Sequence, residues 1–406
     1  MEPLKNAYDR AYLEGLAAQL SEAWGELDAA AFVADAFGDG WDELELKGRM
    51  RRIAETLDRH LPSDLAAALA ILDRVVPRFE GYMAMFFPDL VELRAVREPE
   101  ATWELAVGAL ARYTPYSSSE FAVRPLLVHD QERMLAEHLR WTASKDHHVR
   151  RLASEGCRPR LPWAMALPAL KADPAPLLPI LEALRHDESE YVRRSVANNL
   201  NDVAKDHPDV VRELAARWLA EARELPWTRD EARATGPVAH RSEDVASPPA
   251  TPVPRDDDHG PQTASDRRRL VKHACRTLLK AGDPATMRLF GFRDPAELEV
   301  RGLVLDTPRL AIGERLTFAF ELVTDEPGGL GAVRLEYAVH YCKKNGTSSA
   351  KVFRIAEFET DAAVRAVTRR QAFRDLSTRK HHPGDHVVAV LVNGVEKARV
   401  TFELTR

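Results

Sequence analysis

The octapeptide VRRLASEG at residues 149–156 recurs 43 residues later as VRRSVANN at residues 192–199. A weaker third copy, RRLVKHA, occupies residues 268–274. A period of about 40–47 residues is typical of HEAT and armadillo repeats, in which helix pairs stack into a solenoid. The three copies therefore predict an all-α HEAT-like repeat domain, which we place at residues 1–292.

Amphipathic runs, with apolar residues at i, i+3, i+4 and i+7, fill residues 1–222 and are clearest at 11–24, 45–59, 63–75 and 209–222. Residues 223–265 interrupt them with seven prolines and few large apolar side chains. Such a segment cannot bury enough apolar surface to become ordered. We expect a disordered insertion that closes back on itself, with helices resuming at Arg267 and continuing to about Phe290.

The sequence pattern changes to a period of two after Phe292. Apolar residues alternate with other residues at 335–341, and two Asn-Gly pairs, at 345–346 and 393–394, lie between such runs. Asn-Gly between alternating runs is a strong hairpin signal. We therefore expect five to eight strands over residues 293–406, folded as an immunoglobulin-like β-sandwich.

The formal net charge is −6, from 57 Lys+Arg and 63 Asp+Glu, and it conceals an uneven distribution. Residues 1–100 carry 11 basic and 20 acidic side chains, so the rest of the chain has a net charge of +3. The overall acidity therefore does not exclude a nucleic-acid partner. The first residues, MEPLKN, have no basic-then-apolar leader, and no window approaches 18 uncharged apolar residues. We expect a soluble, cytoplasmic protein with no membrane partner.

Familiar catalytic motifs are absent from the sequence. No G-x-G-x-x-G, Walker loop, H-E-x-x-H or G-x-S-x-G occurs, and the three cysteines are far apart. We expect neither a metal nor a cofactor. The repeat helices carry the notable charges instead: Arg151, Glu155 and Arg158 share one face at i, i+4 and i+7, so two arginines flank one carboxylate.

The third repeat helix carries a basic column of four residues. Its members are Arg268, Lys272, Arg276 and Lys280. Solvated helix surface is the ordinary explanation for such charges, but like charges at i, i+4 cost about 0.2–0.5 kcal/mol per pair. Arg194 and Asn198 occupy the matching face of the second copy. Basic and amide side chains on parallel helices would line a surface for phosphates, so we favour binding to a nucleic-acid backbone.

Three other positions have an ordinary structural explanation beside a functional one. Ser117-x-x-Glu120 fits a capping box at a helix start, and Trp163, after a Pro-punctuated loop, would most often be a core aromatic. Asn198 and Asn199 are poor helix formers in mid-helix, which favours a contact with a ligand or a neighbouring turn.

Three motifs together resemble the AlkC/AlkD family of HEAT-like DNA alkylation-repair glycosylases. They are SSEFAVRP at 118–125, VRRLASEG with RPRLPW at 149–163, and YVRRSVANNLND at 191–202. The AlkC branch is the more similar, on the opening MEPLKN, the helix at 45–54 and a C-terminal immunoglobulin-like domain. The resemblance covers nearly the whole chain. It implies a monofunctional glycosylase of base excision repair that removes 3-methylcytosine and 3-methyladenine from duplex DNA without full base flipping.

The resemblance also assigns roles to residues. It implies that Glu155 is the principal catalytic carboxylate, Glu120 a second carboxylate near the lesion, and Trp163 the aromatic against the damaged nucleotide. It implies that Arg151 reaches into the duplex. Further DNA contacts are expected at Arg158, Arg194, Asn198, Asn199, Lys272 and Arg276. No lysine nucleophile is implied, so we expect neither a Schiff base nor strand cleavage.

Basic tips of the β domain extend this prediction. Lys343, Lys344 and Lys380 lie in hairpins or loops that would hold DNA, although solvated turns are an equal explanation. We expect a monomer bound to double-stranded DNA containing alkylated bases. The alternative is a non-catalytic HEAT-repeat scaffold that binds DNA or protein.

Overall fold

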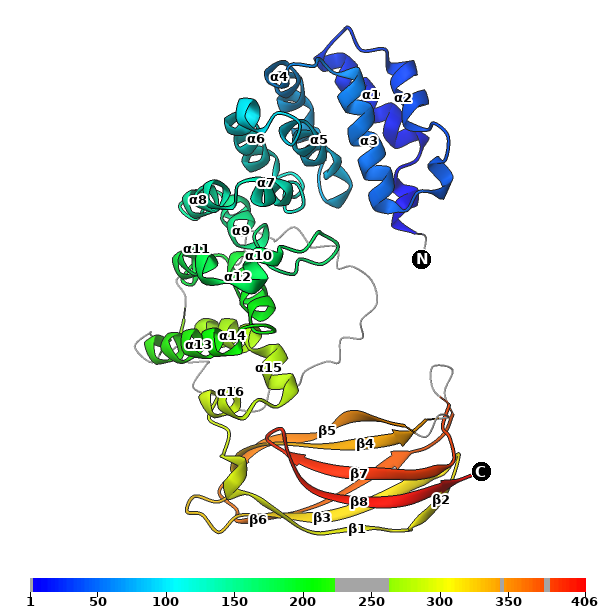
Figure 1. Ribbon diagram of the computed structural model, residues 1–406, viewed down its shortest axis with the longest axis vertical. Coiled ribbons are helices and arrows are strands. Elements are labelled where there is room, and N and C mark those ends of the chain that lie inside the picture. The colour runs from blue at the N-terminus through cyan, green and yellow to red at the C-terminus, as the bar shows by residue number, and fades with distance from the viewer. Residues whose placement is uncertain (1–2, 223–262, 344–346, 376–379) are drawn as a thin grey trace. The chain divides into compact units, whose positions relative to one another are not determined.

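The computed structural model describes residues 3–222, 263–343, 347–375 and 380–406 (Figure 1). The chain divides into two compact units. In the described residues, the first unit comprises 3–207 and 263–274, and the second comprises 208–222 and the residues after 274. The first unit is built from helices, and all the named strands lie in the second. The predicted fold class, helical repeats followed by an all-β part, is confirmed.

The helices of the first unit are α1 (Arg10–Ala23), α2 (Ala29–Ala36), α3 (Leu46–His60), α4 (Leu65–Val75), α5 (Phe86–Ala95), α6 (Pro99–Tyr113), α7 (Val123–His129), α8 (Gln131–Trp141), α9 (His147–Glu155), α10 (Pro168–Ala172), α11 (Leu178–Leu184), α12 (Glu190–Val203) and α14 (Ala264–Ala274). Aspartates begin several of them, because a carboxylate can accept a hydrogen bond from a free backbone N–H of the first turn. Asp9, Asp28, Asp64, Asp130 and Asp146 do this for α1, α2, α4, α8 and α9. The runs predicted at 11–24, 45–59 and 63–75 are α1, α3 and α4.

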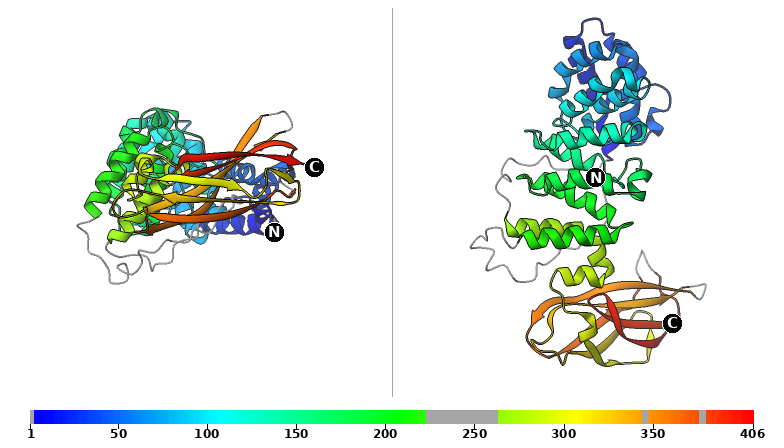
Figure 2. Two further views of the ribbon diagram at one scale, coloured as in Figure 1. Left: turned by 90° about the horizontal axis from the view of Figure 1, so that it is seen from below. Right: turned by 60° about the vertical axis from the view of Figure 1, so that its left-hand side comes forward.

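The three repeat copies lie on neighbouring helices, as the period predicts. Helix α9 packs against α12, and α12 packs against α14. Helices α8 and α11 are the partners of α9 and α12 in their pairs, and the pairs follow one another in chain order (Figures 1 and 2). Val149, Leu152 and Ala153 form the buried stripe of α9. The repeat therefore places corresponding residues of α9 and α12 side by side.

Gly156 directly follows α9 and is a point of close packing. A Cβ atom at this position would lie 2.6 Å from Val123 Cγ2 and 2.9 Å from His138 Cε1. We expect Gly156→Ala to destabilise the protein by about 1–3 kcal/mol, since neither neighbour has room to move. Urea-induced unfolding measures the change.

Gly15→Ala is the matched control. Gly15 is an exposed residue within α1, and its Cβ would meet nothing within 4 Å. Alanine there should leave stability unchanged or raise it by up to about 1 kcal/mol, because glycine is the poorer helix former. Equal unfolding midpoints for Gly156→Ala and the parent would show that the contact around Gly156 is not tight.

The second unit contains α13 (Pro208–Ala222), α15 (Arg276–Ala281), α16 (Pro284–Leu289) and eight strands in its described residues. The strands are β1 (Glu299–Leu305), β2 (Arg309–Ala311), β3 (Arg315–Val323), β4 (Gly331–Cys342), β5 (Ser348–Thr360), β6 (Val364–Ala372), β7 (Gly384–Val392) and β8 (Val395–Thr405). They form a three-stranded sheet in the order β1-β3-β6 and a five-stranded sheet in the order β2-β8-β7-β4-β5. All neighbours are antiparallel except β2 and β8. The domain boundary at 292/293 marks the change from helix to strand and stays a prediction, because α13, α15 and α16 group with the strands.

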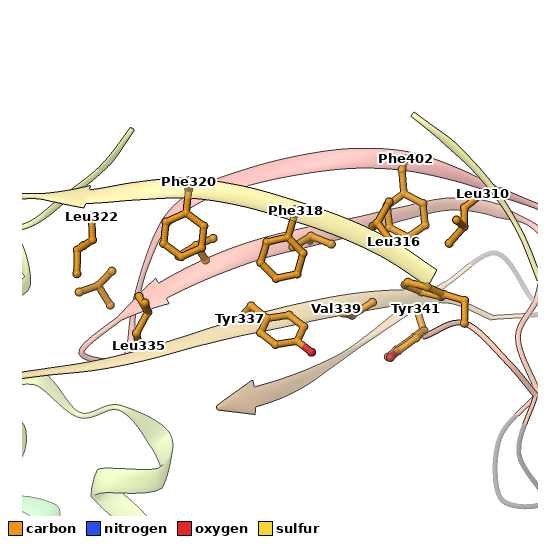
Figure 3. Close-up of a cluster of buried hydrophobic side chains, with 14 of the residues drawn as sticks. Leu310, Leu316, Phe318, Phe320, Leu322, Leu335, Tyr337, Val339, Tyr341 and Phe402 are labelled. Carbon is orange, nitrogen blue, oxygen red and sulfur yellow. The ribbon is translucent and has the colours of Figure 1, made fainter. Parts of the chain in front are cut away.

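The two sheets enclose an apolar core (Figure 3). Strand β3 supplies Leu316, Phe318, Phe320 and Leu322, and β4 supplies Leu335, Tyr337, Val339 and Tyr341. The predicted alternation in β4 is therefore confirmed on its core side. Its other side is also covered, because Glu336 is only 5% exposed and pairs with Arg334 at 2.5 Å.

The hairpin between β7 and β8 turns at Asn393-Gly394, as predicted. Both residues have a positive φ, 47° and 80°, which a type I′ turn requires. The Asn393 side chain is buried, and its Oδ1 accepts a hydrogen bond from the Arg334 N–H at 2.7 Å. The other predicted turn, Asn345-Gly346, lies outside the described residues, as does most of the insertion predicted at 223–265. Its last two residues, Ala264 and Ser265, open α14, so the helix resumes earlier than expected.

No described helix is both long enough and apolar enough to span a membrane.

Candidate active site

The end of α9, the turns before α7 and the middle of α12 bring charged side chains together within the first unit. Glu155 is the last residue of α9 and is 5% exposed. Its Oε1 accepts a hydrogen bond from Arg158 Nη1 at 2.6 Å and lies 3.5 Å from Arg151 Nη2. Its Oε2 accepts a hydrogen bond from Ser195 Oγ on α12 at 2.7 Å. The predicted carboxylate between two arginines is therefore present, but it is buried.

Opposing effects set the protonation of Glu155. Burial raises the pKa of this carboxyl, while the positive charges of Arg151 and Arg158 and the hydrogen bond from Ser195 lower it. The lowering prevails, so the pKa of Glu155 lies below its ordinary value. The carboxylate is therefore ionised at neutral pH.

Arg151 joins Glu155 to the second predicted carboxylate. Its Nη1 lies 2.6 Å from Glu120 Oε2, and its guanidinium carbon lies 5.2 Å from the centre of the Tyr191 ring. Both carboxylates thus contact one buried cation, which holds them close together. Arg151, which the resemblance expects to reach into the duplex, is held inside the protein in this structure, where its side chain is 9% exposed.

The predicted capping box at Ser117 and Glu120 is also wrong. Helix α7 begins only at Val123, and no side chain caps it. The chain turns instead around Ser118, whose Oγ donates to Glu120 Oε2 at 3.1 Å and accepts from the Glu120 N–H at 3.3 Å. The Glu120 carboxylate is therefore not used to start a helix, and 14% of its side chain is exposed.

Two of the predicted DNA contacts point into the protein. Arg158 is 6% exposed, and its Nε donates a hydrogen bond to Asp202 at 2.9 Å while its Nη1 holds Glu155. Asn199 is fully buried, and its Nδ2 donates to the Ser154 carbonyl at 2.9 Å. Both side chains hold α9 against α12, so the prediction that they bind phosphates is corrected.

Other predicted DNA contacts are exposed or half-buried. Arg194 is exposed beside Glu190, at 3.3 Å on the same helix. Asn198 is half-buried, and its Oδ1 lies 2.8 Å from His273 Nε2 on α14. Lys343 and Lys380 are exposed in the second unit, and Lys344 lies outside the described residues.

The basic column is not one continuous helix. Helix α14 ends at Ala274, a turn follows at Cys275, and Arg276 begins α15. Lys272 and Arg276 are therefore half-buried on different helices, which belong to different compact units. The predicted single face through these residues is wrong.

Residues 115–235 match the family model of the DNA alkylation repair enzymes, and residues 299–406 match the C-terminal Ig-like domain of uncharacterised protein YhaZ. The chain is 38% identical over 405 residues to the uncharacterized protein YhaZ of Bacillus subtilis (strain 168), covering 100% of both. A solved structure of Pseudomonas fluorescens alkylpurine DNA glycosylase AlkC, bound to DNA containing an abasic-site analogue, matches with a TM-score of 0.74. The identity is 32% over 100% of each chain. The chain belongs to the AlkC-like family of DNA alkylation repair enzymes. The family that the motifs indicated is confirmed.

In this AlkC-like chain, Trp163 is a surface residue rather than a core aromatic. Its side chain is 46% exposed, and its φ of 67° is rare for a bulky residue. Lys47 Nζ donates to the Trp163 carbonyl at 2.5 Å, and the Tyr82 ring lies edge-on, with 6.1 Å between ring centres. A backbone held in an unfavourable conformation to expose a large aromatic indicates a binding role.

Several residues of this AlkC-like site were not predicted. Ser195 and Asp202 anchor the charged cluster from α12, and Tyr191 covers Arg151. Lys47 reaches Trp163 from a helix 116 residues earlier. The repeat itself carried a signal for Ser195, because it follows VRR in the second copy where Leu152 follows it in the first. A hydroxyl in place of an apolar side chain at an inward position is a mark of a polar partner.

Proposed function

We propose that the protein is a monofunctional DNA glycosylase that excises cationic N-alkylated bases, 3-methylcytosine and 3-methyladenine, from duplex DNA in base excision repair. The observation that carries this proposal is the pair of carboxyl groups, Glu155 and Glu120, that both contact Arg151 in a chain of the AlkC-like family. The alkylpurine activity named for the Pseudomonas protein, 32% identical over the full length, supports it.

The chemistry required is modest, because an alkylated base carries a positive charge and leaves readily. The bond between the base nitrogen and C1′ of the deoxyribose breaks, and the base departs with the electron pair. The sugar then has oxocarbenium character, which a nearby carboxylate stabilises electrostatically. Water adds to C1′ and loses its proton, leaving an abasic site. Glu155 and Glu120 would supply the negative charge and orient the water.

Trp163 and the basic side chains would position the nucleic acid. An exposed indole can attract the charged nucleotide through its ring face, and its surface position is consistent with excision without full base flipping. Arg194, Asn198 and Lys272 in the first unit, and Arg276, Lys343 and Lys380 in the second, are the proposed backbone contacts. Arg151 reaches DNA only if its guanidinium leaves Glu120, so we propose that its first role is to keep Glu155 ionised and to hold Glu120 beside it.

Excision from duplex oligonucleotides carrying a single 3-methylcytosine or 3-methyladenine tests the proposal. We expect release of the free base, detected by chromatography, and an abasic strand that breaks only after alkaline treatment. Undamaged duplex of the same sequence is the control. Binding of the duplex without release of either base would instead favour the non-catalytic scaffold.

A further inference from the structure

A cavity of about 320 Å³ lies beside the candidate active site. It is lined by Lys47, Met50, Arg51, Asp89, Glu92, Phe121, Pro125, Ala164 and Met165. Helices α3 and α5 meet there with two segments, one after Glu120 and one after Trp163. Phe121 directly follows Glu120, and Ala164 directly follows Trp163. Two of the lining residues are therefore next in the chain to residues of the proposed site.

Asp89 is the unusual group in this cavity. Its neighbour on α5, Glu92, is paired with Arg51 of α3 at 2.5 Å. The Asp89 carboxylate, in contrast, makes no hydrogen bond or ion pair in the described parts of the first unit, residues 3–207 and 263–274. Burial and the nearby charge of Glu92 raise its pKa to about 7, although Arg51 and Lys47 oppose the rise. Asp89 is half-buried and lines the cavity, so its carboxylate can accept a hydrogen bond from a molecule bound there.

The remaining walls are apolar and suit a flat ring. Met50, Met165, Phe121, Pro125 and Ala164 provide them. Lys47 Nζ lies 5.0 Å from the centre of the Phe121 ring and also holds the Trp163 carbonyl, so it fixes this wall relative to the tryptophan. A nucleobase is a planar heterocycle that fits within the cavity volume, and its amino edge can donate to a carboxylate.

We propose that this cavity binds the excised alkylated nucleobase after the glycosidic bond is broken, with Asp89 accepting hydrogen bonds from its amino edge. This inference rests on the proposed function. The cavity would thus take the product away from the abasic site.

Isothermal titration of the full-length protein with free 3-methyladenine tests the inference. We expect saturable binding by the parent, and at least about 10-fold weaker binding by Asp89→Asn, which loses the charged acceptor. Asp39→Asn is the matched control, since Asp39 is an exposed carboxylate outside the cavity. Glu155→Gln should bind the free base as the parent does, because Glu155 does not line the cavity.

Excision by each variant is measured in parallel to separate the two proposals. Excision by the parent without binding of the free base, or equal binding by Asp89→Asn and the parent, would overturn the inference and leave the proposed function intact. Absence of excision by the parent would overturn the proposed function and, with it, the assignment of the cavity to a product.

Thermal unfolding shows whether Asp89→Asn is folded and gives an independent readout. The groups around Asp89 are Glu92 on α5, Arg51 and Lys47 on α3, and Tyr8 and Tyr82. A carboxyl whose folded pKa is raised destabilises the folded state as pH rises from its unfolded pKa near 4 to about 7. Asp89→Asn should therefore have a higher Tm than the parent near pH 8 and an equal Tm near pH 4. A lower Tm near pH 8 would show that Asp89 has a structural partner and would contradict the inference.

Discussion

Glu155→Gln should lower the rate of base excision by about 10³-fold while leaving duplex binding nearly unchanged. Glutamine has the same shape: its Oε1 can still accept from Arg158, and its Nε2 can donate to Ser195 Oγ. The change removes only the negative charge that would face the developing oxocarbenium. Single-turnover release of 3-methylcytosine and 3-methyladenine, with enzyme in excess, measures the chemical step apart from product release.

Glu137→Gln is the matched control for this substitution. Glu137 is a buried glutamate of the same unit, paired with Arg140 on α8, and it contacts neither Arg151 nor Glu155. The Glu137→Gln variant should be less stable than the parent. At a temperature where the variant is folded, it should excise the base at the rate of the parent. If Glu155→Gln excises within about threefold of the parent, Glu155 is not the principal carboxylate.

The helical part of the fold is largely readable from the sequence. The helix period is a local signal and predicts α1, α3 and α4, and the 43-residue repeat predicts the adjacent positions of α9, α12 and α14. The sequence also predicts β4 and the turn at Asn393-Gly394. This turn requires a positive φ at both residues, which asparagine and glycine adopt more readily than other residues. The division into compact units is not local, since it depends on how α13, α15 and α16 pack.

The surroundings of the candidate site are much less predictable. Helix geometry places Arg158 near Glu155, but only the fold brings Asp202 and Ser195 to them from 44 and 40 residues away. Those contacts bury side chains that the pattern alone placed on a surface. The predicted cap at Glu120 failed for a similar reason. Ser119 Oγ donates to the Leu110 carbonyl at 2.7 Å and so holds the chain in a turn where a helix start was expected.

Arg151→Met should reduce excision about 100-fold near pH 6 and make the rate rise with pH. In the parent, the charges of Arg151 and Arg158 keep the pKa of Glu155 below its ordinary value in spite of burial. Without Arg151 the effect of burial remains, so the pKa rises and part of the carboxyl is protonated near neutral pH. The rate of the parent should be flat over the same range, because its Glu155 stays ionised.

The same substitution should change how stability depends on pH. A carboxyl with a lowered folded pKa stabilises the protein above its unfolded pKa near 4.3, and this contribution is lost as pH falls through the folded pKa. Arg151→Met removes that contribution and leaves Glu120 and Glu155 without their shared cation, at a cost of up to about 3–5 kcal/mol near neutral pH. Thermal unfolding across the pH range measures this loss of stability. It also gives the temperature below which the variant is folded and its excision rate can be compared with that of the parent.

Arg151→Lys separates the charge of Arg151 from its shape. Lysine keeps a cation near both carboxylates, so the flat pH profile should return, although one ammonium cannot reproduce two separate contacts to Glu120 and Glu155. If Arg151→Lys excises more slowly than the parent by the same factor at every pH, the decrease comes from the lost guanidinium contacts alone. If Arg151→Met also keeps a flat profile, Glu155 does not depend on this cation for its ionisation. The contribution of Arg151 would then come from contact with DNA, as the resemblance to AlkC first indicated.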